Sequence, residues 1–166
     1  MFFTKRKAVL FFIVCLIFFF LTYNDVKSTE ISSVTGYAKV TDGDTLKIDT
    51  FKIRLHGIDA PETTQTCKID LQDWYCGKQS TAELKKIIDN QSVECKVSDI
   101  DIYDRYVAIC STIKTNLNKW MVKNGWAIAY RYYSKDYIED EIFAKKNRLG
   151  MWKGSFTKPS YWRRKN

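Results

Sequence analysis

From residue 35 to residue 55, short stretches of alternating apolar and polar residues are separated by turn-forming residues. The stretches Tyr37–Val40, Leu46–Ile48 and Phe51–Leu55 have the two-residue period of half-buried strands. Asp42-Gly43-Asp44 and Asp49-Thr50 separate them, and Asp and Gly are residues that turns favour. The pattern predicts a three-stranded meander.

After residue 80 the pattern takes a helical period and then returns to strands. Ser80-Thr81-Ala82-Glu83 has the form of a capping box and predicts the start of a helix. With the meander, the whole pattern makes five strands and three helices, a small α+β domain, and a partly open five-stranded barrel would bury such strands economically. The other expected elements are helical positions Leu84, Ile87 and Ile88, strands Val93–Val97 and Tyr106–Cys110, a helix with Leu117, Trp120 and Met121 that ends at Gly125, and a helix from Asp136 to Asn147.

The first 28 residues have the composition of a targeting segment. Lys5-Arg6-Lys7 precede the apolar run Ala8–Leu21, whose 14 residues are fewer than the roughly 20 that a bilayer crossing needs. Small residues suit cleavage after Ser28, so we expect residues 1–28 to be a signal peptide. The domain, residues 29–166, would then be exported, periplasmic or secreted. Retention of residues 8–21 as a membrane anchor is the alternative.

Composition and charge narrow the class of partner. The 166 residues are 45% hydrophobic and 28% charged, which excludes a disordered or collagen-like chain. There are 27 basic and 19 acidic residues, a net charge of +8. Residues 1–28 hold four basic residues and one acidic residue, so the remainder has 23 against 18, a net charge of +5. Such an excess suits polyanions such as nucleic acid or anionic membranes.

Four cysteines follow the apolar run, and this even number favours two disulfides in an oxidising compartment. Cys67 and Cys76 flank a polar loop, whereas Cys95 and Cys110 lie in apolar stretches on either side of a turn near residues 102 and 103. Of the three pairings that four cysteines allow, we favour Cys67–Cys76 with Cys95–Cys110. A zinc site is the alternative, but neither pair has close metal-binding spacing.

Carboxylates are concentrated in two stretches, Thr41–Thr45 and Arg54–Glu62. Alone, Asp42-Gly43-Asp44 is typical of a solvated hairpin turn. In the predicted meander, the start of the second strand lies beside the end of the third, which lets Asp44 and Asp59 converge. Two converging carboxylates require a cation, and Ca²⁺ takes oxygen ligands, including backbone carbonyls. The sequence therefore predicts a calcium site between the two stretches.

Several motifs follow one another in a fixed order: Asp42-Gly43-Asp44-Thr45, Arg54, Ile58-Asp59-Ala60-Pro61-Glu62, Tyr103-x-Arg105 and Ala129-Tyr130-Arg131-Tyr132. In this order and spacing, over about residues 35–152, the chain resembles the staphylococcal nuclease (thermonuclease) family. The resemblance implies an OB-fold barrel with three helices and Ca²⁺-dependent cleavage of DNA and RNA phosphodiesters. The cysteine-bearing loop and the ending with Trp162-Arg163 look like those of exported homologues of Gram-negative bacteria.

The resemblance also implies roles for the acidic residues. Asp44 and Asp59 would bind Ca²⁺ through their carboxylates, and the backbone carbonyl of Ala60 would be a further ligand. Asp42 would support these ligands without touching the ion. Glu62 would be the general base that accepts a proton from the attacking water.

Basic and aromatic residues of the same motifs would contact the substrate. Arg54 and Arg105 would hold the phosphate, because the planar guanidinium donates paired hydrogen bonds and stays charged. Tyr130 and Tyr132, as alternate residues on one face, would line the nucleotide pocket, and Tyr103 would approach the phosphate. Tyrosine rings stack on any base, so we expect a preference for single-stranded DNA or RNA with little sequence specificity.

Two other functions remain open at this stage. A noncatalytic OB-fold module would bind single-stranded nucleic acid, although such a module should lack part of the acidic and arginine set that is present here. A membrane-anchored structural protein would leave that set unexplained. Asp104 stands where many relatives have glycine, and the basic tail Lys158–Lys165 suits either a nucleic-acid track or a cap on the domain. We expect a monomer without an obligate protein partner.

Overall fold

The computed structural model describes residues 31–166. The expected signal peptide or anchor, residues 1–28 with the apolar run 8–21, lies outside the described residues and stays a prediction. In the described part of the chain, the helices are all too short or too polar to cross a bilayer.

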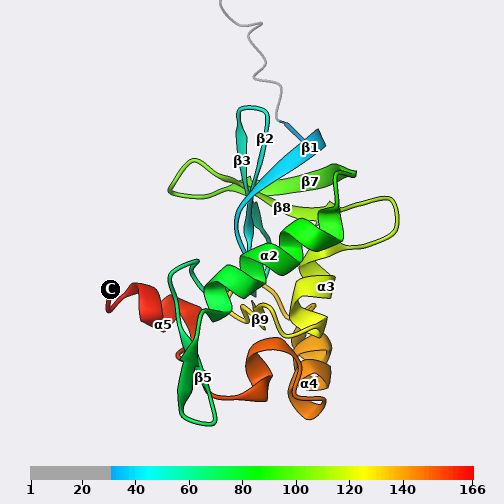
Figure 1. The fold of residues 1–166 in the computed structure, drawn as a ribbon. Helices are drawn as coiled ribbons and strands as arrows, with labels where there is room; N and C mark the ends of the chain where they lie inside the picture. The colour runs from blue at the N-terminus through cyan, green and yellow to red at the C-terminus, as the bar shows by residue number, and fades with distance from the viewer. Residues whose placement is uncertain (1–30) are drawn as a thin grey trace, which may run out of the picture. The chain divides into compact units, whose positions relative to one another are not determined.

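Five strands form a closed barrel in the order β1-β2-β3-β8-β7 (Figure 1). The expected five-stranded α+β fold is confirmed, and the barrel is closed rather than partly open. The predicted meander forms β1 to β3, and β3 then pairs with β8 in the parallel direction while the other pairs are antiparallel. The bounds are β1 Ser33–Asp42, β2 Thr45–Ile48, β3 Phe51–Leu55, β7 Ser92–Ile100 and β8 Tyr106–Ser111.

The barrel interior is filled by the apolar positions that the alternation marked. Leu46, Ile48, Ile53 and Leu55 are buried, whereas Lys47 between the first two points to solvent. Each buried aliphatic side chain of this size contributes about 1.5–3 kcal/mol of transfer free energy. This packing fixes the register of β2 and β3, because a slip of one residue would turn every lysine inward.

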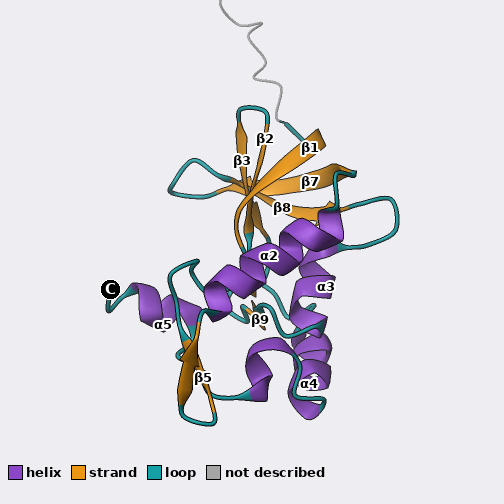
Figure 2. Ribbon diagram, viewed as in Figure 1, coloured by secondary structure: helices purple, strands orange, loops and turns teal. Residues whose placement is uncertain are grey.

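Helices cover one end of the barrel and continue away from it (Figure 2). The predicted start of the first helix at Ser80 is wrong, because α2 already begins at Cys76 and Ser80 is buried in its middle. There the Ser80 hydroxyl donates to the carbonyl of Trp126 (2.7 Å) instead of capping the helix. Within residues 31–166 the structure adds one α-helix, α5 in the tail, to the three that were expected. The helices are α2 Cys76–Ile88, α3 Leu117–Lys123, α4 Ile138–Lys146 and α5 Pro159–Arg163, with a 3-10 turn η1 Gly150–Lys153.

Both predicted disulfides are confirmed, Cys67–Cys76 and Cys95–Cys110. The second joins directly opposite residues of β7 and β8 inside the barrel. The first closes a loop that holds a small hairpin and packs in a second apolar cluster with Ile128 and Met151. Short strands complete the fold, with the hairpin formed by β5 Cys67–Ile69 and β6 Gln72–Trp74, and a further pair formed by β4 Ile58–Asp59 and β9 Ile128–Ala129.

Candidate functional site

The two acidic stretches meet at Arg54, on β3. Its Nη1 forms an ion pair with Asp44 Oδ2, and its Nη2 lies 3.5 Å from Asp59 Oδ1. Nη2 also donates to the carbonyl of Ile58 (3.2 Å), which fixes the guanidinium between the strands. The β2–β3 ladder places Arg54 opposite Thr45, the residue after Asp44. The predicted convergence of Asp44 and Asp59 is therefore confirmed, with Arg54 between them.

Asp44 is a buried carboxylate held in its charged form. Its Oδ2 accepts a hydrogen bond from the backbone N–H of Ala60 (2.7 Å), and its Oδ1 accepts one from the Thr45 hydroxyl (3.2 Å). Burial by itself raises the pKa of Asp44, but the adjacent Arg54 charge and the Ala60 amide outweigh it and bring this pKa below its ordinary value. Asp44 thus stays anionic at neutral pH.

Asp42 is the acid whose charge is least supported. Its Oδ1 accepts a hydrogen bond from the backbone N–H of Asp44 (3.1 Å). Burial, and then the nearby charges of Asp44 and Glu62, raise the pKa of Asp42 to about 7. Asp42 is therefore the acid of this group that is most easily protonated near neutral pH.

Asp59 has both carboxylate oxygens bound by the C-terminal helix. Oδ2 accepts from the backbone N–H of Ser160 (2.9 Å), and Oδ1 accepts from Arg163 Nη2 (2.7 Å). Burial is the main cause that raises the pKa of Asp59, and the Asp44 charge adds to it, while Arg163 and Arg54 lower it without reversing the net rise. The expected metal ligand thus contacts a tail whose role the sequence left open.

Glu62, the expected general base, lies at the edge of the site with 32% of its side chain exposed. Its Oε1 accepts a hydrogen bond from Arg163 Nη1 (2.9 Å), so one guanidinium bridges Asp59 and Glu62. Sequence reasoning missed this use of Arg163, because more than a hundred residues separate it from both partners. The local signals in the tail were its basic residues and Pro159, which begins a short helix, and neither indicates a partner for Arg163.

Arg105 and Tyr103 lie in the turn between β7 and β8. The Arg105 guanidinium binds Asp101 (2.7 and 2.8 Å), which is its carboxylate partner in the described part of the chain, rather than an acid of the site. Tyr103 is 70% exposed and its ring lies 5.4 Å from the Arg105 guanidinium. Asp104 takes a left-handed backbone with φ of 59°, a conformation that glycine adopts more readily than other residues.

Tyr130 and Tyr132 do not lie on one face of a strand, so that premise of the sequence analysis is wrong. β9 ends at Ala129, and Tyr132 lies in the turn that follows it. The Tyr130 N–H donates to the carbonyl of Gly57 (2.9 Å), which ties this segment to the residue before β4. Tyr133 stacks edge-on with both rings (5.0 and 4.9 Å), and Tyr132 is 84% exposed. The aromatic group therefore has three members, and the sequence analysis missed Tyr133.

The charges and donors at the site fit a divalent cation of the oxygen-binding kind. Residues 31–166 contain no cluster of three or more His, Cys, Asp or Glu side chains in metal-binding geometry. The two carboxylates gathered at Arg54 and neighbouring backbone carbonyls are hard oxygen donors. When all are ionised, four carboxylates exceed two guanidinium groups by two charges, which one divalent cation would balance. The six groups are Asp42, Asp44, Asp59, Glu62, Arg54 and Arg163.

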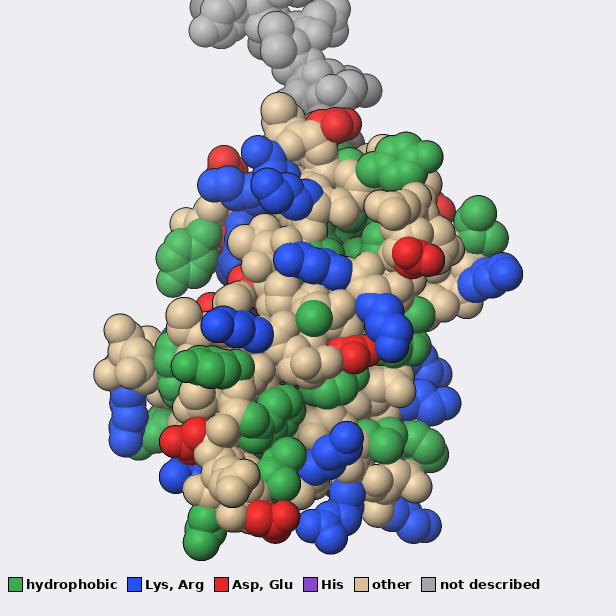
Figure 3. Space-filling model, in the orientation of Figure 1, with side chains coloured by type: hydrophobic (Ala, Val, Ile, Leu, Met, Phe, Trp, Pro, Cys, Tyr) green, Lys and Arg blue, Asp and Glu red, His purple; other side chains and the backbone are tan. Residues whose placement is uncertain are grey.

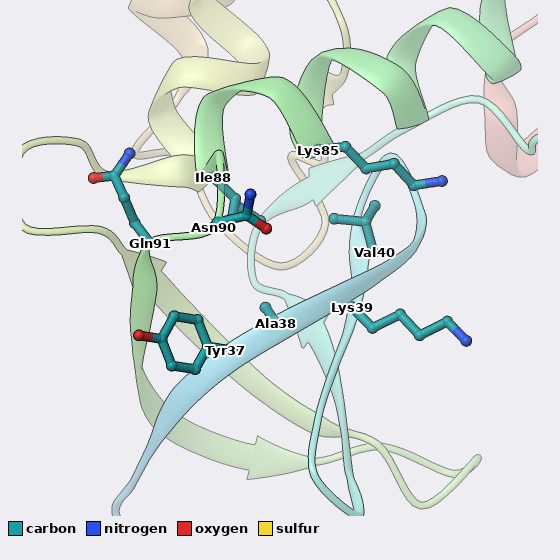
Figure 4. Close-up of a pocket in the computed structure, with 8 residues that line it drawn as sticks. All are labelled: Tyr37, Ala38, Lys39, Val40, Lys85, Ile88, Asn90 and Gln91. Atoms are coloured by element: carbon teal, nitrogen blue, oxygen red, sulfur yellow. The ribbon is translucent and has the colours of Figure 1, made fainter.

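A separate groove of about 340 Å³ lies between β1 and the end of α2 (Figure 4). Tyr37 and Lys39 border it on the strand, and Lys85 and Ile88 border it on the helix. None of its eight lining residues belongs to the carboxylate site. Basic side chains are spread over the face of the molecule in Figure 3 rather than gathered into one patch.

Comparison with known proteins places these features in a family. The family described as "Staphylococcal nuclease homologue" matches residues 52–154. The chain is 31% identical to succinoglycan biosynthesis protein ExoI of Rhizobium meliloti, over 72% of this chain and 65% of that protein. It is 34% identical to an uncharacterized endonuclease of Haemophilus influenzae, over 76% of this chain and 70% of that protein. It is 31% identical to a micrococcal nuclease of Shigella flexneri, over 76% of this chain and 78% of that protein.

Proposed function

The chain belongs to the staphylococcal nuclease family, and from this we propose that it is a nuclease that hydrolyses phosphodiester bonds of DNA and RNA with Ca²⁺. The observation that carries the proposal is the bridge of Arg54 between Asp44 and Asp59, with Glu62 three residues beyond. Relatives named as endonuclease and micrococcal nuclease support the reaction class.

In this proposal Asp44 and Asp59 hold the cation through carboxylate oxygens, and the Ala60 carbonyl adds a third donor. A bound Ca²⁺ would supply positive charge to the phosphate and to the attacking water. Asp42 keeps the backbone of Asp44 in place through its hydrogen bond to the Asp44 N–H. Burial, and then the negative charges of Asp44 and Glu62, raise the pKa of Asp42, and a bound cation would favour its charged form.

Glu62 acts as the general base. It accepts a proton from water as the water oxygen bonds to phosphorus, the ester P–O bond breaks, and the leaving oxygen takes a proton from solvent. The charge that accumulates on the phosphate oxygens is stabilised by Arg54, which is already fixed between the two acids. Arg105 would exchange its Asp101 partner for a phosphate oxygen when a strand binds.

Tyr103, Tyr130 and Tyr132 would contact the nucleotide, and the exposed rings of Tyr103 and Tyr132 suit stacking on unpaired bases. Stacking does not read base identity, so the substrate would be single-stranded DNA or RNA of any sequence. We further propose that the protein acts as an exported monomer, with residues 1–28 as signal peptide or, through residues 8–21, as anchor. A noncatalytic module that only binds single strands is the competing function.

The test is cleavage of denatured DNA with Ca²⁺ and with a chelator, by the wild type and Glu62→Gln. We expect the chelator to abolish cleavage and Glu62→Gln to lower kcat by about 10² to 10⁴-fold, since proton transfer by a placed base contributes this much. Glu83→Gln on α2 is the matched control, because Glu83 contacts Gln79 away from the site. Binding of DNA without Ca²⁺-dependent cleavage would instead identify the noncatalytic module.

A further inference from the structure

The C-terminal helix α5 makes three hydrogen bonds to the two carboxylates on which the proposed reaction depends. The Ser160 N–H binds Asp59 Oδ2 (2.9 Å), and Arg163 binds Asp59 Oδ1 (2.7 Å) and Glu62 Oε1 (2.9 Å). The matched family region ends at residue 154, so α5 lies beyond it. The tail is thus part of the site and not only a cap on the domain.

The position of α5 is set by the disulfide-bonded loop. Ser155 pairs with Lys68 of β5 through two backbone hydrogen bonds (2.8 and 2.9 Å), and the buried Gln65 side chain donates to the Thr157 carbonyl (2.7 Å). At Gly154 a Cβ would stand 1.8 Å from the Lys68 carbonyl oxygen, so only glycine allows this approach. Figure 1 shows α5 and β5 next to each other. Arg163 therefore reaches the acids from an anchored segment.

Arg163 has two physical effects on these acids. Its planar fork ties Glu62, which is one-third exposed and otherwise free to change rotamer, to the buried Asp59. Its positive charge also lies at Asp59 Oδ1 (2.7 Å), the oxygen from which Arg54 Nη2 is 3.5 Å away. A fixed positive charge at a metal ligand opposes the binding of a cation by Coulomb repulsion.

We propose that Arg163 is a positioning residue of the nuclease site, which holds Glu62 beside Asp59 and at the same time weakens the affinity of the site for Ca²⁺. This inference rests on the proposed function. It assigns to α5 two measurable effects of opposite sign, on turnover and on metal affinity. A helix that merely stabilised the fold would change both in the same direction.

The experiment compares the wild type, Arg163→Gln and Arg164→Gln. Arg164 is the adjacent arginine and lies over the Tyr161 ring (5.5 Å), so its replacement removes the same charge without touching the acids. Calorimetric titration with Ca²⁺, without substrate, gives the dissociation constant, and cleavage of denatured DNA gives kcat and KM. For Arg163→Gln we expect Ca²⁺ binding about tenfold tighter and kcat about 10 to 100-fold lower, with KM nearly unchanged. Arg164→Gln should match the wild type in both.

A third variant distinguishes the effect of the positive charge from the effect of the two hydrogen bonds that the planar guanidinium donates. Arg163→Lys keeps the positive charge but cannot donate to both acids in one plane, so it should restore the wild-type Ca²⁺ affinity while kcat stays low. Thermal unfolding monitored by circular dichroism confirms that each variant is folded. If Arg163→Gln unfolds, Arg163→Lys carries the test through its kcat alone.

The proposal is overturned if Arg163→Gln binds Ca²⁺ equally well or more weakly, or if its kcat equals that of Arg164→Gln. An Arg163→Lys variant with wild-type kcat overturns it as well. A wild-type protein that binds Ca²⁺ but does not cleave DNA refutes the proposed function instead. The titration reports on Arg163 in either case, so the two failures are distinguishable.

Discussion

At the scale of single residues, the site is a set of charges that constrain one another. Arg54 is nearly buried and balances Asp44 and Asp59, each of which would be costly to keep ionised in the interior alone. The same principle operates at Glu141 on α4. The structure buries it, with Arg131 (2.6 Å) and Lys145 (3.2 Å) as partners. Arg131 thereby anchors the turn that carries Tyr130 and Tyr132.

Asp101 offers a pH-dependent prediction at this scale. Slight burial raises the pKa of Asp101, but hydrogen bonds from Arg105 and from the Tyr103 N–H outweigh it, so the pKa lies below its ordinary value in the folded protein. A carboxylate with a lowered folded pKa stabilises the protein above the unfolded value of 3.8 and loses this effect as the pH falls through the folded pKa.

We therefore expect Asp101→Asn to lower the free energy of unfolding by about 1 kcal/mol at pH 7, the upper range for a solvent-screened pair. Urea unfolding measures the difference between wild type and variant at pH 7 and at pH 3. The difference should shrink at pH 3. Asp99→Asn, two residues before, is the control. An undiminished difference at pH 3 would contradict a role for the Asp101 charge.

At the scale of elements, the two disulfides stabilise different parts of the fold. Cys95–Cys110 joins neighbouring strands of the barrel, whose ladder already holds them together. Cys67–Cys76 closes the loop that contains β5 and β6. Lys68 in this loop pairs with Ser155, in the segment before α5. We therefore expect Cys95–Cys110 to stabilise the barrel, and Cys67–Cys76 to help place Ser160 and Arg163 at the site.

The corresponding prediction compares two double variants. Cys67→Ala with Cys76→Ala should lower kcat by about 10 to 100-fold, because supporting contacts of a metal site contribute this much. Cys95→Ala with Cys110→Ala should lower the unfolding free energy by about 3 kcal/mol, as expected for a loop of this length, and leave kcat within about twofold. Steady-state cleavage and urea unfolding measure the two effects. Equal losses of kcat in both variants would contradict a specific role of the Cys67–Cys76 loop in positioning the site.

At the scale of the whole molecule, the basic side chains of the described residues are spread over the face shown in Figure 3 rather than gathered at one place. Distributed positive charge attracts a nucleic-acid strand from a distance and releases its counterions on contact. It does not choose the bond to be cut. In the proposed function, that choice would depend on the carboxylates and guanidinium groups gathered at Arg54 and Arg163.

Substrate binding should accordingly weaken with salt. For about three phosphate contacts, raising the salt from about 50 to 200 mM should raise KM for denatured DNA by about tenfold or more. The kcat at saturating substrate should change little, because the buried ion pairs of the site are screened far less. Steady-state kinetics across this series is the measurement. A KM independent of salt would exclude a role for the basic surface in binding.

The sequence alone determined the features that depend on neighbours in the chain. Alternation placed Leu46, Ile48 and Ile53 in the barrel, turn chemistry placed Asp44 at the β1–β2 corner, and cysteine spacing predicted both disulfides. These features follow from local periodicity and short loops, because the residues of a single strand or turn are enough to specify them. The family motifs added the residues expected to share a site.

Only the tertiary structure decided which distant groups touch. The bridge from Arg163 to Asp59 and Glu62 spans more than a hundred residues, and no local pattern in the chain encodes it. The start of α2 at Cys76 and the turn at Tyr132 likewise follow from packing against other elements, which overrides a capping box or an alternating pair. Contacts of this kind depend on the closed barrel and the docked tail, and only the folded chain supplies them.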